Sequence, residues 1–502
     1  MTSPDLDTLR PTTAPVPKRF WWLRLGLAVG LVVALAVGVT RVWWGRYAAR
    51  QFDAEVVKMR ALGEPVFAED FNAAPVPNDQ NAAILLRRAT DRILEEFSGP
   101  ASSNLEYPES PPYTKEWHAL ADASEKANGE TFALARQARS LPQVDWEVRF
   151  TSPLINTPLG PLSRQRQLAI TVADGMLWSH LHGDDHEAIE RTLDLLRHTE
   201  AVRSPPMFLT DLVSFGCEAH ALYRLQVIAG SLAIESGVAS PRFATTQPSD
   251  APATLRPATR AQVKQLISQL QAKPDGVADV RAAIVYERAF MADTIQYFAG
   301  QARLTYPLVQ LGMAKAFRES NRTLDVFGVS TLSDLRAGLQ RIAPATKGKD
   351  VRTLDLWASY QSGFAFTYDR YLDSRARVVA ERRMTVVILA ARLYYADHGR
   401  WPQAASDLVP TYLDSMPIDP YANPPVPVRY DVLPNALPDG TDRPVVSVRV
   451  PAVQAPAPPT KPTYVYATGT LGQARDVSSW SPPAQVEKMR SAATKPAETP
   501  VE

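Results

Sequence analysis

The chain has 502 residues, enough for two or three domains at about 150 residues each. Its 54 basic and 53 acidic residues nearly cancel, which argues against a broad nucleic-acid-binding surface. The single cysteine, Cys217, excludes a disulfide within the chain. No Walker A loop, dinucleotide fingerprint or hydrolase motif occurs, so we expect no cofactor.

The N-terminal region contains an uncharged apolar run from Leu25 to Thr40. As a helix this run is about 24 Å long, and the tryptophan pairs at 21–22 and 43–44 extend it to both membrane interfaces. We therefore predict a disordered tail over 1–20 and a transmembrane helix over 21–44, held in the lipid bilayer. The alternative is a cleaved signal peptide, but Arg41 and Trp43 follow the run instead of a small-residue cleavage site.

Small residues recur every four positions along this segment. They are Gly26, Gly30, Ala34 and Gly38. Such a ridge allows two membrane helices to approach closely, and it predicts a homo-oligomer formed through the transmembrane helix. The alternative is that small residues are simply common in membrane helices.

The clearest unit in the body is a helical hairpin between 162 and 203. Apolar residues recur at four-residue spacing up to Met176, Gly183 and Asp184 interrupt the pattern, and the helical period resumes at Ile189. Asp184 is placed to cap the second helix, with Glu187 three residues on. The stretch from 183 to 190 resembles the turn and second helix of a tetratricopeptide repeat, although no second copy follows at that family's period.

The rest of the body is predicted to be helical. The boundaries are a helical domain over 45–235, a linker or long loop over 236–260, and a second helical segment over 261–373. Within these we expect helices at about 45–62, 79–97, 115–140, 207–235, 277–300, 306–320, 332–342 and 354–371. On the helix over 207–235, Val213, Gly216, Tyr223 and Val227 form one apolar stripe.

A small α+β module is expected over 374–472, followed by a disordered tail over 473–502. A helix over 375–398 ends at Gly399, where a left-handed cap fits, and Pro402 prevents its continuation. Short strands near 428–432, 445–450 and 464–468 form an antiparallel sheet. The fold class is thus mainly α, with a small C-terminal sheet.

The C-terminal module resembles the major pseudopilins of type II secretion. The resemblance is carried by segments 393–395, 398–402, 417–420 and 466–469. It implies a body on the periplasmic side of a bacterial inner membrane. The early glutamate of pseudopilins is missing, and Thr470, Leu471 and Gly472 stand where calcium-binding aspartates are usual, so neither pilin-like polymerisation nor calcium binding is expected.

The same ending, joined to a membrane helix and a helical middle, is also similar to a group of membrane-anchored bacterial proteins of unknown function. Segments 78–85, 162–168 and 183–189 carry this second resemblance. It implies the overall order of parts, and it implies no activity.

Two groups of residues are candidates for chemistry. His180, His182, Asp185 and His186, next to Asp184, are the densest set of potential metal ligands, and the alternative is a polar hairpin turn. Cys217 and His220 have the spacing of a nucleophile and base on one helix face, and the alternative is a buried thiol beside a core histidine.

These observations favour a membrane-anchored interaction or scaffold protein of the bacterial cell envelope, with a protein partner and no nucleic acid. The first alternative is an accessory component of a secretion or pilus-like system. The second is a metal-dependent hydrolase that uses the cluster from His180 to His186.

Overall fold

The computed structural model describes residues 18–94, 115–158, 162–236, 256–300, 306–329, 331–342, 356–433, 442–449, 463–467 and 476–481. The first six helices are α1 (Lys18–Ala61), α2 (Ala82–Asp91), α3 (Lys115–Ala127), α4 (Gly129–Arg139), α5 (Leu162–Leu181) and α6 (Asp185–Val202). The next six are α7 (Phe208–Ala229), α8 (Arg260–Ala272), α9 (Val277–Gly300), α10 (Tyr306–Leu324), α11 (Leu332–Ile342) and α12 (Leu356–His398). The protein is therefore mainly helical, as predicted.

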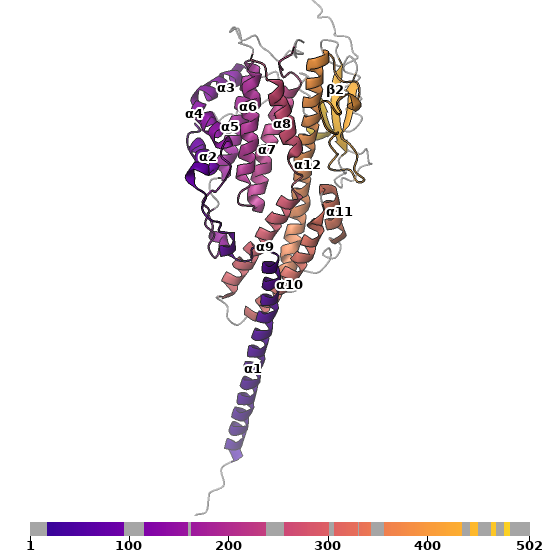
Figure 1. The fold of residues 1–502 in the computed structure, drawn as a ribbon. Coiled ribbons are helices and arrows are strands. Elements are labelled where there is room, and N and C mark those ends of the chain that lie inside the picture. The colour runs from indigo at the N-terminus through magenta and orange to yellow at the C-terminus, as the bar shows by residue number, and fades with distance from the viewer. Residues whose placement is uncertain are drawn as a thin grey trace, which may run out of the picture.

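Helix α1 projects from one end of an elongated body (Figure 1). It is the one helix in the described ranges that is long and apolar enough to cross a membrane, and its apolar window is wholly exposed. Its last turns are buried instead: Phe52, Val56 and Met59 pack with α9 and α10, and the ring centroids of Phe52 and Phe317 are 5.6 Å apart. One continuous helix thus links the exposed apolar segment to the core.

The body is built around the antiparallel hairpin of α5 and α6, which confirms that prediction. Asp184 caps α6, because its Oδ1 accepts a hydrogen bond of 2.9 Å from the Glu187 backbone N–H. Ala188 and Met176 are fully buried between the two helices and α7. Helices α2 and α4 cover the outer side of the hairpin, and α7 covers the other side.

Four short strands form an antiparallel sheet in the order β1 (Arg429–Leu433), β2 (Arg443–Arg449), β3 (Thr463–Ala467) and β4 (Asp476–Ser481). Val446 of β2 pairs with Tyr430 on one side and Tyr466 on the other. The sheet packs on the C-terminal half of α12, at the end of the body away from α1 (Figure 1). Three strands confirm the prediction, whereas β4 lies where a tail was expected.

Several predicted boundaries differ from the observed ones. Asn81 rather than 78 or 79 caps α2, because its side chain accepts a bond from the Ala83 N–H. The single helix expected over 115–140 is divided at Asn128, which is fully buried and bonded to Ser124 and Leu94. The two helices expected over 354–371 and 375–398 are one continuous helix, α12.

The predicted segments also share one core. The largest hydrophobic cluster extends from Trp117 of α3 through α7, α8 and α12 to Val448 of β2. The helical segments before 235/236 and after 260/261 therefore contribute to the same hydrophobic core. Helix α8, absent from the expected elements, begins at Arg260 with Thr259 as its N-cap. The tail over 1–17 and most of the tail over 473–502 lie outside the described residues.

Candidate functional site

The predicted metal ligands lie at the turn between α5 and α6, but the structure does not bring all of them together. His180 Nδ1 is 2.5 Å from Asp185 Oδ1. His182 points elsewhere: its ring stacks on Trp178 at 4.1 Å between centroids, and its Nε2 is 3.4 Å from Asp122. Within the described ranges, no three His, Cys, Asp or Glu side chains are grouped to hold a metal ion. The structure therefore gives the metal prediction no geometric support.

His180 has a second neighbour that the sequence does not reveal. Its Nε2 lies 3.0 Å from the hydroxyl oxygen of Ser231, which follows the end of α7. Asp185 is held in turn by the Ala233 backbone N–H, which donates to its second carboxylate oxygen at 2.7 Å. Ser231, His180 and Asp185 thus form one hydrogen-bonded chain between two turns.

Cys217 is buried on α7, and burial raises the pKa of its thiol to about 12. A thiol with this pKa is almost entirely protonated near neutral pH, and the thiolate is the form that attacks. The structure therefore favours the alternative of a small buried thiol over a nucleophile.

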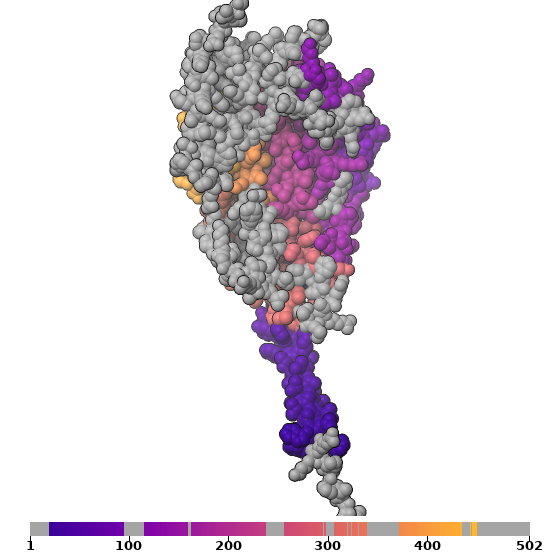
Figure 2. Space-filling view, turned by 180° about the vertical axis from the view of Figure 1, so that it is seen from behind, coloured from indigo at the N-terminus to yellow at the C-terminus, as the bar shows by residue number. Residues whose placement is uncertain are grey.

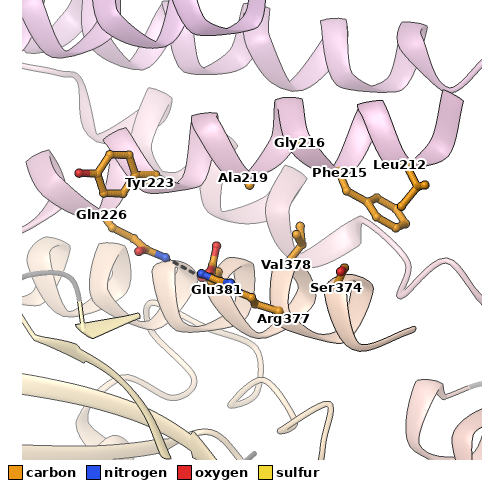
Figure 3. Close-up of a pocket in the computed structure, with 10 residues that line it drawn as sticks. All are labelled: Leu212, Phe215, Gly216, Ala219, Tyr223, Gln226, Ser374, Arg377, Val378 and Glu381. Atoms are coloured by element: carbon orange, nitrogen blue, oxygen red, sulfur yellow. Dashed lines mark hydrogen bonds and ion pairs between the residues drawn. The ribbon is translucent and has the colours of Figure 1, made fainter. Parts of the chain in front are cut away.

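The described residues form a groove between α7 and α12, which we call the α7–α12 groove. It has a volume of about 350 Å³, comparable with the smaller ligand pockets of proteins. Its lining residues are Leu212, Phe215, Gly216, Ala219, Tyr223, Gln226, Ser374, Arg377, Val378 and Glu381. Figure 3 shows Gly216 and Ala219 of α7 facing Val378 and Ser374 of α12. The surfaces of the two helices, magenta and orange, meet on the face drawn in Figure 2.

Helix α7 buries charged side chains and leaves some apolar side chains partly exposed. Its buried face carries the charged residues Asp211, Glu218 and Arg224. Its apolar stripe is only half-buried, from Leu212 and Val213 through Ala219 to Val227, and Leu209 on the same helix is 45% exposed. The stripe predicted from sequence exists at the edge of the core: Val213 and Val227 pack against the buried clusters, and Gly216 and Tyr223 line the groove.

Buried ion pairs explain why charged residues occupy the inner face of α7. Glu218 bonds Lys273 at 2.8 Å and Arg382 of α12 at 3.1 Å. Burial alone would raise the pKa of Glu218, but the charges of Lys273 and Arg382 outweigh it and lower the pKa to about 2.

A second cluster near the start of α7 joins it to α9 and α12. Arg375 bonds Asp211 at 2.9 Å and Asp279 at 2.7 Å, and Tyr371 donates its hydroxyl proton to Asp211. Together the two clusters join α7 to α12 on the buried side of the α7–α12 groove.

The floor of the groove is also tied across the two helices. Gln226 of α7 donates to the Glu381 carbonyl at 3.4 Å (Figure 3). It also donates to the Thr385 hydroxyl at 3.2 Å. Arg377 bonds Glu381 along the rim at 3.1 Å. A Cβ atom added at Gly216 would meet nothing within 4 Å, so the groove is open beside this residue.

The small-residue ridge of α1 lies in its exposed apolar window. Added Cβ atoms at Gly26, Gly30 and Gly38 would meet nothing within 4 Å, so this face is unoccupied in the single chain. Self-association through the ridge stays a prediction.

Comparison with known proteins gives no relative: no family model matches the chain, nor does any curated protein or solved structure. The tetratricopeptide and pseudopilin resemblances therefore stay predictions.

Proposed function

We propose that the protein is a single-pass membrane protein that binds a partner protein through its α7–α12 groove. The observation that carries this proposal is the partly exposed apolar stripe of α7 along a groove of about 350 Å³, with Leu209 45% exposed on the same helix. Apolar side chains that stay partly exposed together on a protein surface are typical of an interaction site. The buried ion pairs of α7 keep this surface in one shape, which reduces the ordering cost of binding.

The chemistry of the groove favours a helix of the partner as its occupant. On the α7 side, the centre of the groove is lined by the small residues Gly216 and Ala219. Small residues let a second helix approach closely. Larger apolar side chains flank this centre, and Tyr223 and Arg377 supply polar groups at the rim. A helix with an apolar stripe and polar flanks fits this arrangement, as in other helix-in-groove interactions.

The membrane part of the proposal rests on α1. A lipid bilayer would cover the apolar side chains that are exposed in α1, and it would leave the buried turns from Phe52 to Met59 in the body. The resemblance to pseudopilins favours a bacterial inner membrane with the body in the periplasm. An accessory role in a secretion or pilus-like system is the alternative that this resemblance supports.

The groove is tested by site-specific photo-crosslinking in cells. A benzophenone side chain at Ala219 of the full-length protein should give one heteromeric adduct, and the same group at exposed Arg88 on α2 should not. Gly216→Leu fills open space in the groove and should reduce the Ala219 adduct at least tenfold. Equal adducts at both sites, or an adduct unchanged by Gly216→Leu, would contradict the proposal. An adduct to the chain itself would assign the groove to self-association.

The side of the membrane is tested by thiol labelling. Because Cys217 is buried and its thiol is protonated, all labelling should come from an introduced cysteine. Arg164→Cys on α5, with the arginine side chain 54% exposed, should react with a membrane-impermeant maleimide in intact spheroplasts if the body is periplasmic. Protection until lysis would place the body in the cytoplasm.

A further inference from the structure

The hydrogen-bonded chain of Ser231, His180 and Asp185 has the order of groups found in serine hydrolases. The serine oxygen is 3.0 Å from His180 Nε2, and His180 Nδ1 is 2.5 Å from Asp185 Oδ1. In such sites a carboxylate fixes the imidazole, and the imidazole takes the proton of the attacking hydroxyl. We propose that Ser231 is a nucleophile for acyl transfer, with His180 as its base and Asp185 as the positioning carboxylate.

The surroundings hold the three groups in place. Asp185 is 3% exposed, and its other oxygen accepts the Ala233 N–H at 2.7 Å, so the carboxylate cannot rotate away from His180. In the tautomer that this chain of hydrogen bonds requires, Nδ1 of a neutral His180 donates to Asp185 and Nε2 accepts from Ser231. The segment at 256–258 bonds both turns: Arg256 N–H donates to the Gly183 carbonyl and Ala258 N–H to the Ala233 carbonyl.

Two of the three groups are partly exposed to solvent. The His180 side chain is 11% exposed and Ser231 is half-buried, whereas the adjacent Leu232 is fully buried. The Ser231 oxygen also lies 3.3 Å from the Ile228 carbonyl, a longer contact than the one to His180. Arg392 of α12 donates to the Leu232 carbonyl at 2.8 Å, and its positive charge interacts with Asp185.

The reaction that fits is hydrolysis of a small uncharged acyl ester. The Ser231 oxygen forms a bond to the acyl carbon while its proton moves to His180 Nε2, and the carbonyl oxygen becomes an alkoxide. Collapse breaks the bond to the leaving alcohol, which takes the proton from His180. Water then attacks the acyl-serine with the same proton transfers, which releases the carboxylic acid and restores Ser231.

The test uses a fluorophosphonate probe, which labels serines that are activated as nucleophiles. Detergent-solubilised full-length protein should be labelled on the peptide that contains Ser231, and Ser231→Ala should lose all labelling. His180→Gln and Asp185→Asn should each reduce labelling at least tenfold. His182→Gln is the matched control, because His182 lies on the same turn but contacts Trp178 and Asp122, and labelling should be unchanged.

Thermal unfolding of each variant separates this role from a structural one. Retained melting temperature with lost labelling supports the proposal, and Asp185→Asn provides a second route if His180→Gln fails to fold. A wild-type protein that is not labelled on Ser231 overturns the proposal, and so does labelling that is unchanged in both His180→Gln and Asp185→Asn. A lower melting temperature of Ser231→Ala together with an unlabelled wild type would show that the three residues only join two turns.

Discussion

Lys273 and Glu218 form an ion pair of 2.8 Å in the interior of the body, with side chains only 8% and 2% exposed. The pair joins the end of α8 to the middle of α7, and Arg382 extends it to α12. Removing one member of a buried pair leaves an uncompensated charge, which costs about 3–5 kcal/mol. We expect Glu218→Gln to lower the free energy of unfolding by this amount, measured by chemical denaturation of the solubilised protein. The exposed pair of Arg164 and Asp91 is the control, because Asp91→Asn should cost under about 1 kcal/mol.

The same carboxylate predicts a pH dependence. The pKa of Glu218 falls from 4.5 to about 2 on folding, so the folded state binds fewer protons than the unfolded state between these values. The stability from Glu218 is therefore complete above about pH 4.5 and is lost as the pH falls toward 2, by about 3 kcal/mol. The difference in unfolding free energy between wild type and Glu218→Gln should shrink over this range. A difference that stays constant with pH would contradict the assignment.

His198 of α6 predicts a second effect at higher pH. Burial lowers its pKa from 6.5 to about 4, although its Nε2 lies 2.9 Å from the Gln165 carbonyl oxygen. The unfolded chain protonates first, so His198 causes a loss of about 3 kcal/mol between pH 6.5 and 4. His198→Gln should lose less stability than wild type across this window in parallel denaturation curves. If the unfolding free energies of wild type and His198→Gln fall equally between pH 6.5 and 4, the inferred pKa of His198 is contradicted.

Two helical glycines should respond oppositely to alanine. At Gly175 of α5 a Cβ would lie 2.5 Å from Arg191 Nη1 and 3.0 Å from the Phe132 ring, and Arg191 is fixed by bonds of 2.6 Å to Glu125. Gly175→Ala should therefore destabilise by about 1–3 kcal/mol. At Gly216 the Cβ meets only open space, so Gly216→Ala should stabilise α7 by about 0.5–1 kcal/mol. Melting temperatures that shift in the same direction would contradict the packing described here.

Truncation of α1 should separate the proposed anchor from the core. Deleting 1–44 should release a folded body from the membrane fraction, measured by carbonate extraction. Deleting 1–61 also removes Phe52, Val56 and Met59, whose burial is worth about 1.5–3 kcal/mol each. The longer deletion should unfold at a clearly lower temperature than the shorter one. Retention of the 1–44 deletion in membranes would place the anchor elsewhere.

Local signals in the sequence were sufficient for many individual elements. The helical period predicted α9 and α11 with their observed bounds, and the cap residues Asp184 and Gly399 fell where expected, with Gly399 at a φ of +70°. These features depend on neighbours within a few positions, so sequence spacing determines them. The boundaries that failed depend on tertiary contacts, as at Asn128, whose buried side chain divides α3 from α4.

The candidate sites depended on distant pairs and could be predicted only in part. His180 and Asp185 were among the predicted residues, but Ser231 is 51 positions from His180 and carries no motif. The apolar stripe of α7 could be predicted from the sequence. The burial of Glu218 and Asp211 on the other side of α7 could not, because it depends on their ion pairs with Arg382 and Arg375 of α12. From the sequence alone, a charged residue is predicted to be exposed unless its buried ion-pair partner is known.

In the proposed membrane-anchored arrangement, the continuity of α1 would set the height and rotation of the body relative to the bilayer. From Trp44 to Met59 the helix rises about 1.5 Å and turns about 100° per residue, and Phe52 packs on Phe317 of α10. A single residue inserted near Gly45 would thus turn the whole body by roughly a quarter of a circle about its stem. In a dimer joined through the glycine ridge, that angle decides whether two α7–α12 grooves face each other or face apart.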